Sequence, residues 1–241
     1  LTRVHAHETG ASEAFHGGRN EAYVFGFTED DRWVDVDLAG AYTTAMVAIK
    51  MPDWDKLKVV QDIKEFKADE LGFAYLKFKF PSDTIYPCLP VRSDNGLIFP
   101  LEGETYAGSP EIVLALEMGA VLTDVEGVIV PWASDDRPFE PFSTDIKQRR
   151  EANIKGSPPE QTWKEIGNSV YGKTAQGLKA KNVYDNRSDQ SQRLPPSRVT
   201  QPYLAAYITS LVRAALGEMI ARVPLNKEVV SATTDGFITN Q

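Results

Sequence analysis

A nine-residue run, KEIGNSVYG from Lys164 to Gly172, combines a cation, small polar side chains and an aromatic ring. Its Lys164, Asn168 and Tyr171 are spaced at i, i+4 and i+7, which predicts a single helical face about two turns long. Lysine can bind a phosphate and a ring can pack against a base, so this face suits a nucleotide. For the run taken alone, a surface helix with an incidental lysine and tyrosine is the alternative.

Two aspartates, Asp37 and Asp235, each lie at the end of a short apolar run that reads as a strand. They are far apart in the sequence, so only the fold could bring them together. A pair of carboxylates, completed by substrate phosphates and water, is sufficient for Mg²⁺. The alternative is that both are strand-end caps, and Asp35 competes for the first position because it shares a strand face with Asp37.

Four segments resemble the motifs of family B DNA polymerases, in the order found in that family. The helical run is similar to the fingers motif Lys-x-x-x-Asn-Ser-x-Tyr-Gly at every defined position. DLAGAYT (37–43) resembles the first palm motif, Asp-x-x-Ser-Leu-Tyr-Pro, and TTDGFIT (233–239) resembles the second, Asp-Thr-Asp-Ser. FHGGRNEAYVF (15–25) is similar to the Tyr-x-Gly-Gly element of the branch found in phages, linear plasmids and mobile elements.

The chain departs from these motifs at several positions. Thr233 replaces the first aspartate of the second palm motif, and Gly236 replaces its serine. Phe15 replaces the leading tyrosine of the Gly-Gly element, which keeps the ring and loses the hydroxyl. The first palm motif differs at Gly40, Ala41 and Thr43.

The resemblance implies catalysis by two divalent ions, Mg²⁺ or Mn²⁺, held by Asp37, Asp235 and the backbone carbonyl of Leu38. It selects Asp37 over Asp35, because the family places its tyrosine five residues after the catalytic aspartate, as Tyr42 is here. The second aspartate of the second palm motif is the principal ligand in the family. We therefore expect activity to survive the replacement at Thr233.

The resemblance also implies a nucleotide site. Tyr42 would exclude ribonucleotides by contact with C2′ of the sugar, Tyr171 would stack near the nascent base pair, and Lys164 would hold the triphosphate. Which of two adjacent arginines assists Lys164 stays open, because neighbours on a helix point about 100° apart; Lys155 is a third candidate. The nucleotide-binding residues implied are Tyr42, Arg149, Arg150, Lys164, Asn168 and Tyr171.

Template and primer DNA, dNTPs and, in protein-primed relatives, a terminal protein are the partners that the resemblance implies. The two glycines of the Gly-Gly element would let the backbone approach template phosphates, with an arginine adding charge; an ordinary Gly-Gly turn is the alternative. The DNA-binding residues implied are Gly17, Gly18, Arg19, Ser169, Gly172 and Lys173.

Charge distribution, cysteine content and the lack of long apolar runs indicate the class of protein. The chain has 241 residues and a net charge of −8, but residues 146–181 hold eight basic and three acidic side chains. That segment carries +5 and the remainder −13, as expected for a phosphate site beside a carboxylate site. The single Cys88 fits a reducing interior. No eighteen-residue apolar run and no leading signal pattern is present, so we expect no membrane contact. We expect a cytoplasmic protein of a bacterial or phage-infected cell, or a protein of a mitochondrial plasmid. His5 and His7 have no further ligands near them in the sequence, which argues against a metal site.

Periodicity and turn residues predict the elements that position these groups. Asn95-Gly96 indicates a hairpin, and Ser109-Pro110-Glu111 indicates a helix start. The predicted strands are 21–27 and 33–36, joined by a turn at 29–31, then 71–80, 120–130 and 229–232; the predicted helices are 38–49, 109–119 and 203–223, with a loop at 156–159 between two more.

The fold class expected is α+β: a small mixed sheet with helices on one face (the palm), a helical hairpin (the fingers) and an inserted subdomain. The expected division is 1–48 palm with the Gly-Gly element and first catalytic motif, 49–141 inserted subdomain resembling a terminal-protein region, 142–182 fingers, and 183–241 palm with the second catalytic motif. The chain stops six residues after Asp235, so we expect it to be a core fragment without thumb or exonuclease.

The function expected is template-directed DNA synthesis for a phage, plasmid or mobile element, with a slight preference for the primer-independent subgroup. The alternative is a truncated or non-catalytic DNA-binding or assembly module that keeps the fold. A two-metal nuclease would need more carboxylates and would leave the nucleotide-facing helix unexplained.

Overall fold

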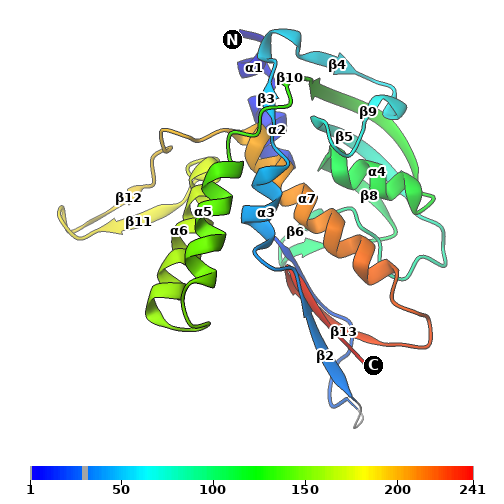
Figure 1. Ribbon diagram of the computed structural model, residues 1–241. Helices are drawn as coiled ribbons and strands as arrows, with labels where there is room; N and C mark the ends of the chain where they lie inside the picture. Colours follow the sequence, from blue (N-terminus) through cyan, green and yellow to red (C-terminus); the bar gives the residue numbers. More distant parts are fainter. Residues whose placement is uncertain (1, 29–31, 241) are drawn as a thin grey trace.

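The chain folds around one buried helix, α7 (Pro202–Ala221), in a computed structural model that describes residues 2–28 and 32–240 (Figure 1). Tyr203, Tyr207 and Ile208 belong to the first hydrophobic cluster, Ala214 to the second, and Leu216 and Ile220 to the third. The helix predicted at 203–223 is confirmed, but it is buried over most of its surface rather than along one stripe. The other helices are α1 (Thr2–Ala6), α2 (Glu8–Ala14), α3 (Ala41–Val47), α4 (Ser109–Glu117), α5 (Glu140–Glu151) and α6 (Pro158–Ala175).

The composition of α7 also meets the length and hydropathy expected of a membrane span. Of the described residues, only this helix does so, and 67% of its apolar window is buried inside the fold. Its packing in the three clusters accounts for that apolar surface.

Four short strands from two distant parts of the chain form the first sheet. Its order is β1 (Arg19–Ala22), β13 (Val229–Thr234), β14 (Gly236–Asn240), β2 (Trp33–Asp37), and every neighbouring pair is antiparallel. Leu216 and Ile220 of α7 cover one face of it. The two segments predicted to carry the catalytic aspartates therefore lie on adjacent strands of one sheet, below α3 and α7 in Figure 1.

The strand predicted at 33–36 is confirmed as β2, whereas most of the strand predicted at 21–27 is wrong. The strand β1 ends at Ala22 and lies on the opposite edge of the sheet from β2, because the β13–β14 hairpin is inserted between them. Phe25 and Phe27, read as strand residues, are fully exposed and lie in a loop. The turn predicted at 29–31 lies outside the described residues.

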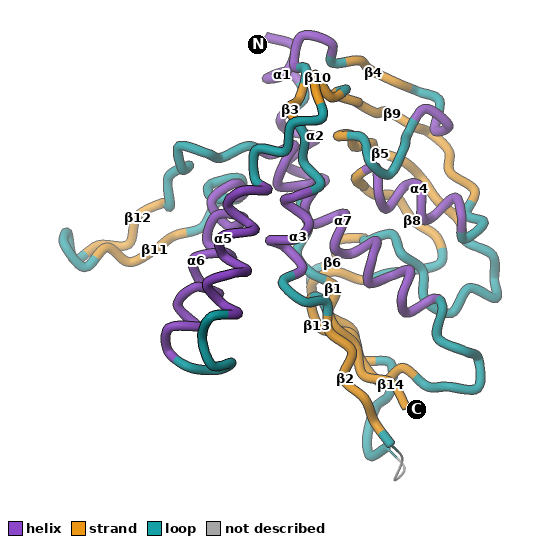
Figure 2. The backbone as a smooth tube through the Cα atoms, viewed as in Figure 1, coloured by secondary structure: helices purple, strands orange, loops and turns teal. Residues whose placement is uncertain are grey.

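A second antiparallel sheet occupies residues 58–130, on the other side of α7 (Figure 2). The predicted strands at 71–80 and 120–130 are confirmed as its central pair, and α4 begins and ends as predicted, with Gly119 in the left-handed conformation that follows the helix (φ +82°). Leu71, Phe73 and Val128 of this sheet share the first cluster with α7, so the region is not packed separately from the rest. The strands are, in order across the sheet, β4 (Lys58–Val60), β9 (Val121–Val130), β5 (Leu71–Lys79) and β8 (Glu102–Gly108).

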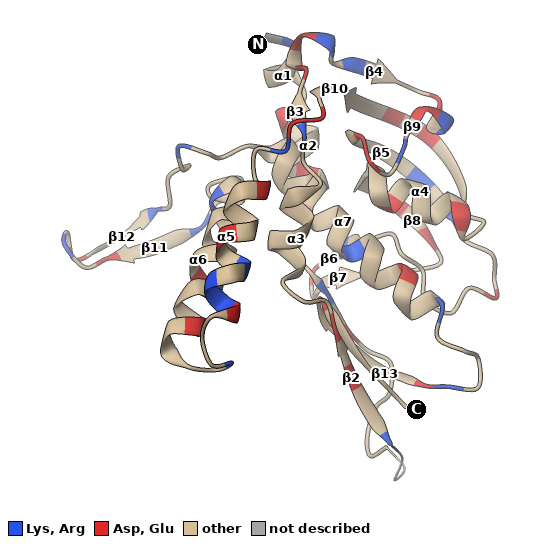
Figure 3. Ribbon diagram, in the orientation of Figure 1, with Lys and Arg blue, Asp and Glu red and all other residues tan. Residues whose placement is uncertain are grey.

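Smaller elements complete the chain. The α5–α6 hairpin projects from the centre of the molecule, joined by the predicted loop. An extended β11–β12 hairpin follows it, which the sequence analysis did not predict. Figure 3 shows both basic and acidic residues on α5, α6 and this hairpin, and both kinds also on the second sheet. The short strands are β3 (Met51–Pro52), β6 (Val91–Ser93), β7 (Gly96–Ile98), β10 (Trp132–Ser134), β11 (Asn182–Asp185) and β12 (Gln190–Arg193), of which β6 and β7 form the predicted hairpin.

Candidate active site

Asp235 lies in the tight turn between β13 and β14. Its backbone N–H donates to the carbonyl of Thr233 at 2.7 Å, a hydrogen bond that spans a single intervening residue. That residue, Thr234, has φ +58°, which is rare for a β-branched side chain. The carbonyl of Asp235 accepts a hydrogen bond at 3.0 Å from the backbone N–H of Leu38, which ties the turn to the end of β2.

Asp37 lies beside this turn because β2 pairs with β14. The pairing sets Asp37 opposite Gly236. A Cβ on Gly236 would meet Val36 O at 2.9 Å and Asp37 Oδ1 at 3.1 Å, so the absence of a side chain lets the carboxylate lie against the strand. The replacement of the usual serine by glycine at this position thus has a steric consequence here.

The two carboxylates open onto one shallow pocket of about 400 Å³. Burial raises the pKa of Asp235, and the neighbouring charge of Asp37 raises it further, while Lys164 lowers it. In the described ranges, neither carboxylate is in an ion pair, and no group of three or more histidine, cysteine or acidic residues could hold a metal. The lining residues are Asp35, Asp37, Thr233, Asp235, Gly236, Phe237 and Ile238.

The helix α6 carries the nine-residue run and packs closely on α3 and α5. A Cβ on Gly167 would lie 3.0 Å from methyl groups of both Ile146 and Thr43. Gly167 is three residues after Lys164 and four before Tyr171, so these residues share the face that approaches α3. Along this face Gly167 is buried and Asn168 and Tyr171 are half-buried, whereas Lys164 is exposed at its N-terminal end.

Tyr42 and Tyr171 meet across this α3–α6 contact. Their rings are stacked, with centroids 4.3 Å apart and planes inclined by 10°. Burial raises the pKa of both phenols, Arg213 lowers it for both, and Asp235 raises it further for Tyr42. The structure thus brings the predicted sugar-contacting and base-contacting residues together, close to the second aspartate.

The two adjacent arginines have different surroundings. Arg149 pairs with Asp145 at 2.8 Å and lies over the ring of Trp163, 4.4 Å from its centroid. Arg150 pairs with Glu160 at 2.8 Å, and its Nη1 is 3.9 Å from where a Cβ on Gly40 would lie. Of the two, Arg150 faces the first palm motif.

The remaining residues of the predicted set are less enclosed. Asn168 is half-buried, and Gly172 and Lys155 are exposed. The hydroxyl of Ser169 donates to the Ile166 carbonyl of its own helix at 2.8 Å, and Lys173 donates to Gln176 at 2.6 Å.

The Gly-Gly element lies against the turn that holds Asp235. A Cβ on Gly18 would be 2.9 Å from Cα of Thr234, so only glycine allows this approach, whereas Gly17 has open space around it. Arg213 of α7 donates to the carbonyls of His16 (3.0 Å) and Gly17 (2.9 Å). The same guanidinium forms a buried two-hydrogen-bond pair with Glu111, both at 2.8 Å.

The expectation that Arg19 adds surface charge for template phosphates is not met. Its side chain is 1% exposed, bonds to Glu21 at 2.5 Å and lies 4.2 Å from the centroid of the Phe99 ring. The strand alternation of β1 turns it inward, toward α7 at Gly217.

Sequence reasoning missed Asn20, which follows Arg19 on β1. Its Oδ1 accepts a hydrogen bond at 3.1 Å from the backbone N–H of Thr234. Nothing local to residue 20 indicates this contact, because it depends on the pairing of β1 with β13, 214 residues along the chain.

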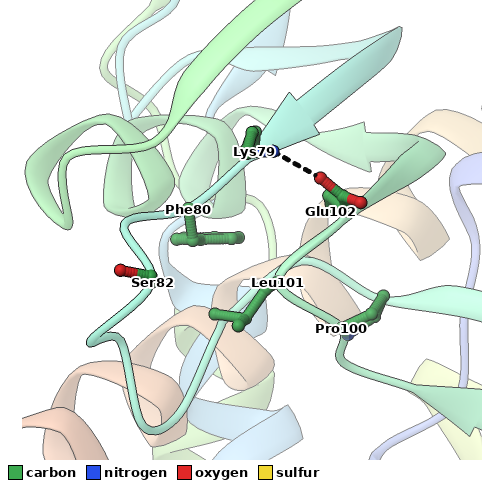
Figure 4. A pocket seen from close by; sticks show the side chains of 6 residues that line it. All are labelled: Lys79, Phe80, Ser82, Pro100, Leu101 and Glu102. Atoms are coloured by element: carbon green, nitrogen blue, oxygen red, sulfur yellow. Dashed lines mark hydrogen bonds and ion pairs between the residues drawn. The ribbon is translucent and has the colours of Figure 1, made fainter.

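One other pocket, of about 350 Å³, lies at the edge of the second sheet (Figure 4). Lys79 and Glu102 form an ion pair of 2.8 Å across it. Phe80, Pro100 and Leu101 supply most of the rest of its lining. Because its two charged side chains pair with each other, this pocket offers no free charged group for a reaction.

Residues 11–201 match the family described as DNA polymerase type B, organellar and viral. The chain is 47% identical over 242 residues to the primer-independent DNA polymerase PolB of Escherichia coli, across 97% of this chain and 28% of that protein. Two phi29 DNA polymerase structures are also similar. The complex with primer-template DNA and incoming nucleotide has a TM-score of 0.69 at 16% identity, and the post-translocation complex with primer-template DNA has 0.67 at 15%. Each covers 98% of this chain and 43% of the phi29 chain, so the likeness shows the fold of a part of that enzyme.

Proposed function

The chain belongs to the type B DNA polymerases of the organellar and viral kind, and from this we propose that it carries the nucleotide-incorporating core of a DNA-directed DNA polymerase. The observation that carries the proposal is the convergence of three segments. Asp37 and Asp235 share one open pocket, and the stacked Tyr42 and Tyr171 lie beside it. A DNA-binding module without chemistry would not need these groups together.

The donor set fits divalent cations of the magnesium type. Asp35, Asp37 and Asp235 line the pocket. The repulsion from Asp37 that adds to burial in raising the pKa of Asp235 is relieved when a cation lies between these two carboxylates. We infer that Asp37 and Asp235, with the carbonyl of Leu38, hold two ions, Mg²⁺ or Mn²⁺. When bound there, such ions would lower the pKa of a primer 3′-hydroxyl and would neutralise charge on the reacting oxygens.

The protein's own groups would bind and orient the incoming dNTP. Lys164 is exposed on the helix that also carries Tyr171, and its charge lowers the pKa of Asp235, so its ammonium would bind the phosphates beside the cations. Arg150 would add a second cation at the start of α3, once it shares or leaves its pairing with Glu160. The ring of Tyr42 would then close the space beside C2′ of the sugar.

The stacked tyrosines occupy the surface on which a base pair would lie. Binding of a nucleotide therefore requires Tyr171 to separate from Tyr42, and α6 would carry it, since both Lys164 and Tyr171 are on that helix. Asn168, Ser169, Gly172 and Lys173 continue the same helix toward the template.

We propose a division into palm (1–48 and 183–241), inserted region (49–141) and fingers (142–182). The inserted region resembles in position the part that engages a terminal protein in protein-primed relatives. The 47% identity to a primer-independent polymerase favours initiation without a protein primer for this chain. DNA template, primer and dNTPs are thus its proposed partners, in the replication of a phage, plasmid or integrated element.

Extension of a labelled primer–template by one nucleotide, with Mg²⁺ and dNTPs, tests the proposal in the full-length natural protein. A primer-free template is run beside it, and Asp235→Asn serves as the matched inactive control. Primer extension that the control lacks is the expected result, and product from the primer-free template would assign the primer-independent mode. Bound DNA with no product in either reaction would instead indicate a module without catalysis.

A further inference from the structure

The turn that presents Asp235 has an unfavourable backbone. Thr234 has a positive φ of 58°, and the hydrogen bond across it joins residues only two apart. A γ-turn with positive φ is the rarer and more strained type, and a β-branched residue is poorly suited to it. Contacts from outside the turn must therefore keep this conformation in place.

Asn20 supplies such contacts from the neighbouring strand. Its Oδ1 accepts from the backbone N–H of Thr234 at 3.1 Å and from the Thr234 hydroxyl at 3.4 Å. Its Nδ2 donates to the carbonyl of Gly18 at 3.3 Å. One side chain thus joins the strained residue to the Gly-Gly element, and it does so beside the register pair Arg19–Thr234.

The segment that carries Asn20 is itself fixed on its N-terminal side by two arginines from different elements. Arg92 of β6 donates to the carbonyls of Glu13 and Phe15, and Arg213 of α7 donates to those of His16 and Gly17. Gly18 then fits against Cα of Thr234 without a side chain. The strand β1 is therefore a rigid support rather than a mobile edge.

We propose that Asn20 is a positioning residue for nucleotidyl transfer: it holds Thr234 at positive φ and so fixes the Asp235 carboxylate relative to Asp37. This inference rests on the proposed function, because Asp235 is taken as a ligand of the catalytic cations. Asn20 does not line the pocket between the two aspartates. Its effect should therefore fall on the rate of the chemical step, and nucleotide and DNA affinity should be spared.

Single-turnover nucleotide incorporation by the full-length natural protein tests the proposal. Asn20→Ala should lower the maximum rate about tenfold or more, since a misplacement of about 1 Å can cost 10²-fold. The dNTP concentration at half-maximal rate and the Kd for primer–template should stay within about twofold of wild type. Asn182→Ala, on the exposed strand β11, is the matched control and should leave all three unchanged.

A second variant separates positioning from general damage. Thr234→Gly in the Asn20→Ala background should restore most of the lost rate, because glycine adopts positive φ without the steric cost. Thermal unfolding of each variant shows whether the folded population is the same.

The outcomes distinguish this inference from the function on which it rests. An active wild type with an equally fast Asn20→Ala variant would overturn the positioning role and leave the polymerase assignment intact. A rate loss that Thr234→Gly does not relieve would also overturn it, since the loss would then come from another cause. A wild type that incorporates no nucleotide would overturn the proposed function, and the positioning role with it.

Discussion

The two sheets of this molecule differ in the length of their strands and in the side chains that they hold. The second sheet has long central strands, β5 and β9, which pair along most of their length and bury apolar side chains. The first sheet has strands of four to six residues, a strained turn and three acidic side chains in one pocket. The second sheet stabilises the fold, whereas the first sheet holds acidic groups whose burial and repulsion oppose folding. The helix α7 packs against both sheets. The substitutions that follow test how far this separation holds.

The largest effect should follow loss of charge in the first sheet. Asp235→Asn should reduce nucleotide incorporation at least about 10³-fold, or about 4 kcal/mol in the activation free energy, with DNA binding nearly intact. Burial and Asp37 raise the pKa of Asp235, so the folded state disfavours its charge, and the neutral amide should raise the free energy of unfolding. Rate and chemical denaturation measured on the same preparation check both parts.

Asp35→Asn is the matched comparison, because Asp35 lines the same pocket on the same strand face. We expect it to lose less than about tenfold in rate, an amount that corresponds to 1.4 kcal/mol. A loss as large as that of Asp235→Asn would show that Asp35, and not Asp37 alone, acts on this side of the site.

The converse substitution lies in the second sheet. Leu76 is fully buried in the second cluster, so Leu76→Ala should cost about 2–5 kcal/mol of unfolding free energy. The incorporation rate per folded molecule should be unchanged, because no residue of this cluster lines the carboxylate pocket. Urea denaturation gives the first quantity and active-site titration the second. A parallel fall in specific rate would mean that the two sheets are coupled more tightly than their separate clusters indicate.

The two sheets also differ in what could be predicted from the sequence. The second sheet and the elements around it follow from local signals: the alternation at 71–80, the turn at Asn95-Gly96 and the helix start at Ser109-Pro110 all predict elements that the structure contains. The first sheet has short strands that pair across more than 200 residues, so neither its order nor the partner of β1 could be predicted. The strand predicted at 33–36 is present as β2, but the one predicted at 21–27 is not, because β1 covers 19–22 and pairs with β13.

The residues of the candidate site also divide into those that the sequence could predict and those that it could not. Motif resemblance identified Asp37, Tyr42, Tyr171 and Asp235, which the fold brings together. The inward turn of Arg19 and the role of Asn20 depend on strand register, which the motif letters do not contain. Arg149 and Arg150 are adjacent in the sequence, so the sequence does not show which of them faces the site. The packing of α5 against α6 and α3 shows it, because it places Arg150 beside Glu160 and Gly40.

His16 contacts the second sheet from the Gly-Gly element, and the pH-dependence of stability can test this contact. It is buried, its Nε2–H donates to the carbonyl of Tyr106 in β8, and burial with the nearby Arg213 lowers its pKa to about 3. The unfolded chain binds a proton near pH 6.5 that the folded chain does not. The free energy of unfolding should therefore fall as pH decreases below 6.5, by about 1.4 kcal/mol per pH unit down to the folded pKa.

The comparison between pH 7 and pH 5 isolates this effect, since most carboxyl groups stay charged in that range. Denaturant unfolding of wild type should lose about 2 kcal/mol between these two pH values. His16→Gln, which keeps a donor for Tyr106, should lose much less. Equal losses in the two proteins would place the pH-dependence elsewhere and leave His16 as an ordinary packed side chain.

The smallest expected effect concerns selectivity rather than rate or stability. Tyr42 stacks on Tyr171 beside the first sheet, and its ring is the group proposed to meet C2′ of the incoming sugar. Tyr42→Ala should raise the use of ribonucleotides relative to deoxynucleotides by about tenfold or more, or about 1.4 kcal/mol of discrimination. Tyr42→Phe is the control, because it keeps the ring and should keep the selectivity. If Tyr42→Ala and wild type discriminate equally, the sugar is recognised elsewhere, and the stacked pair serves only to hold α6 against α3.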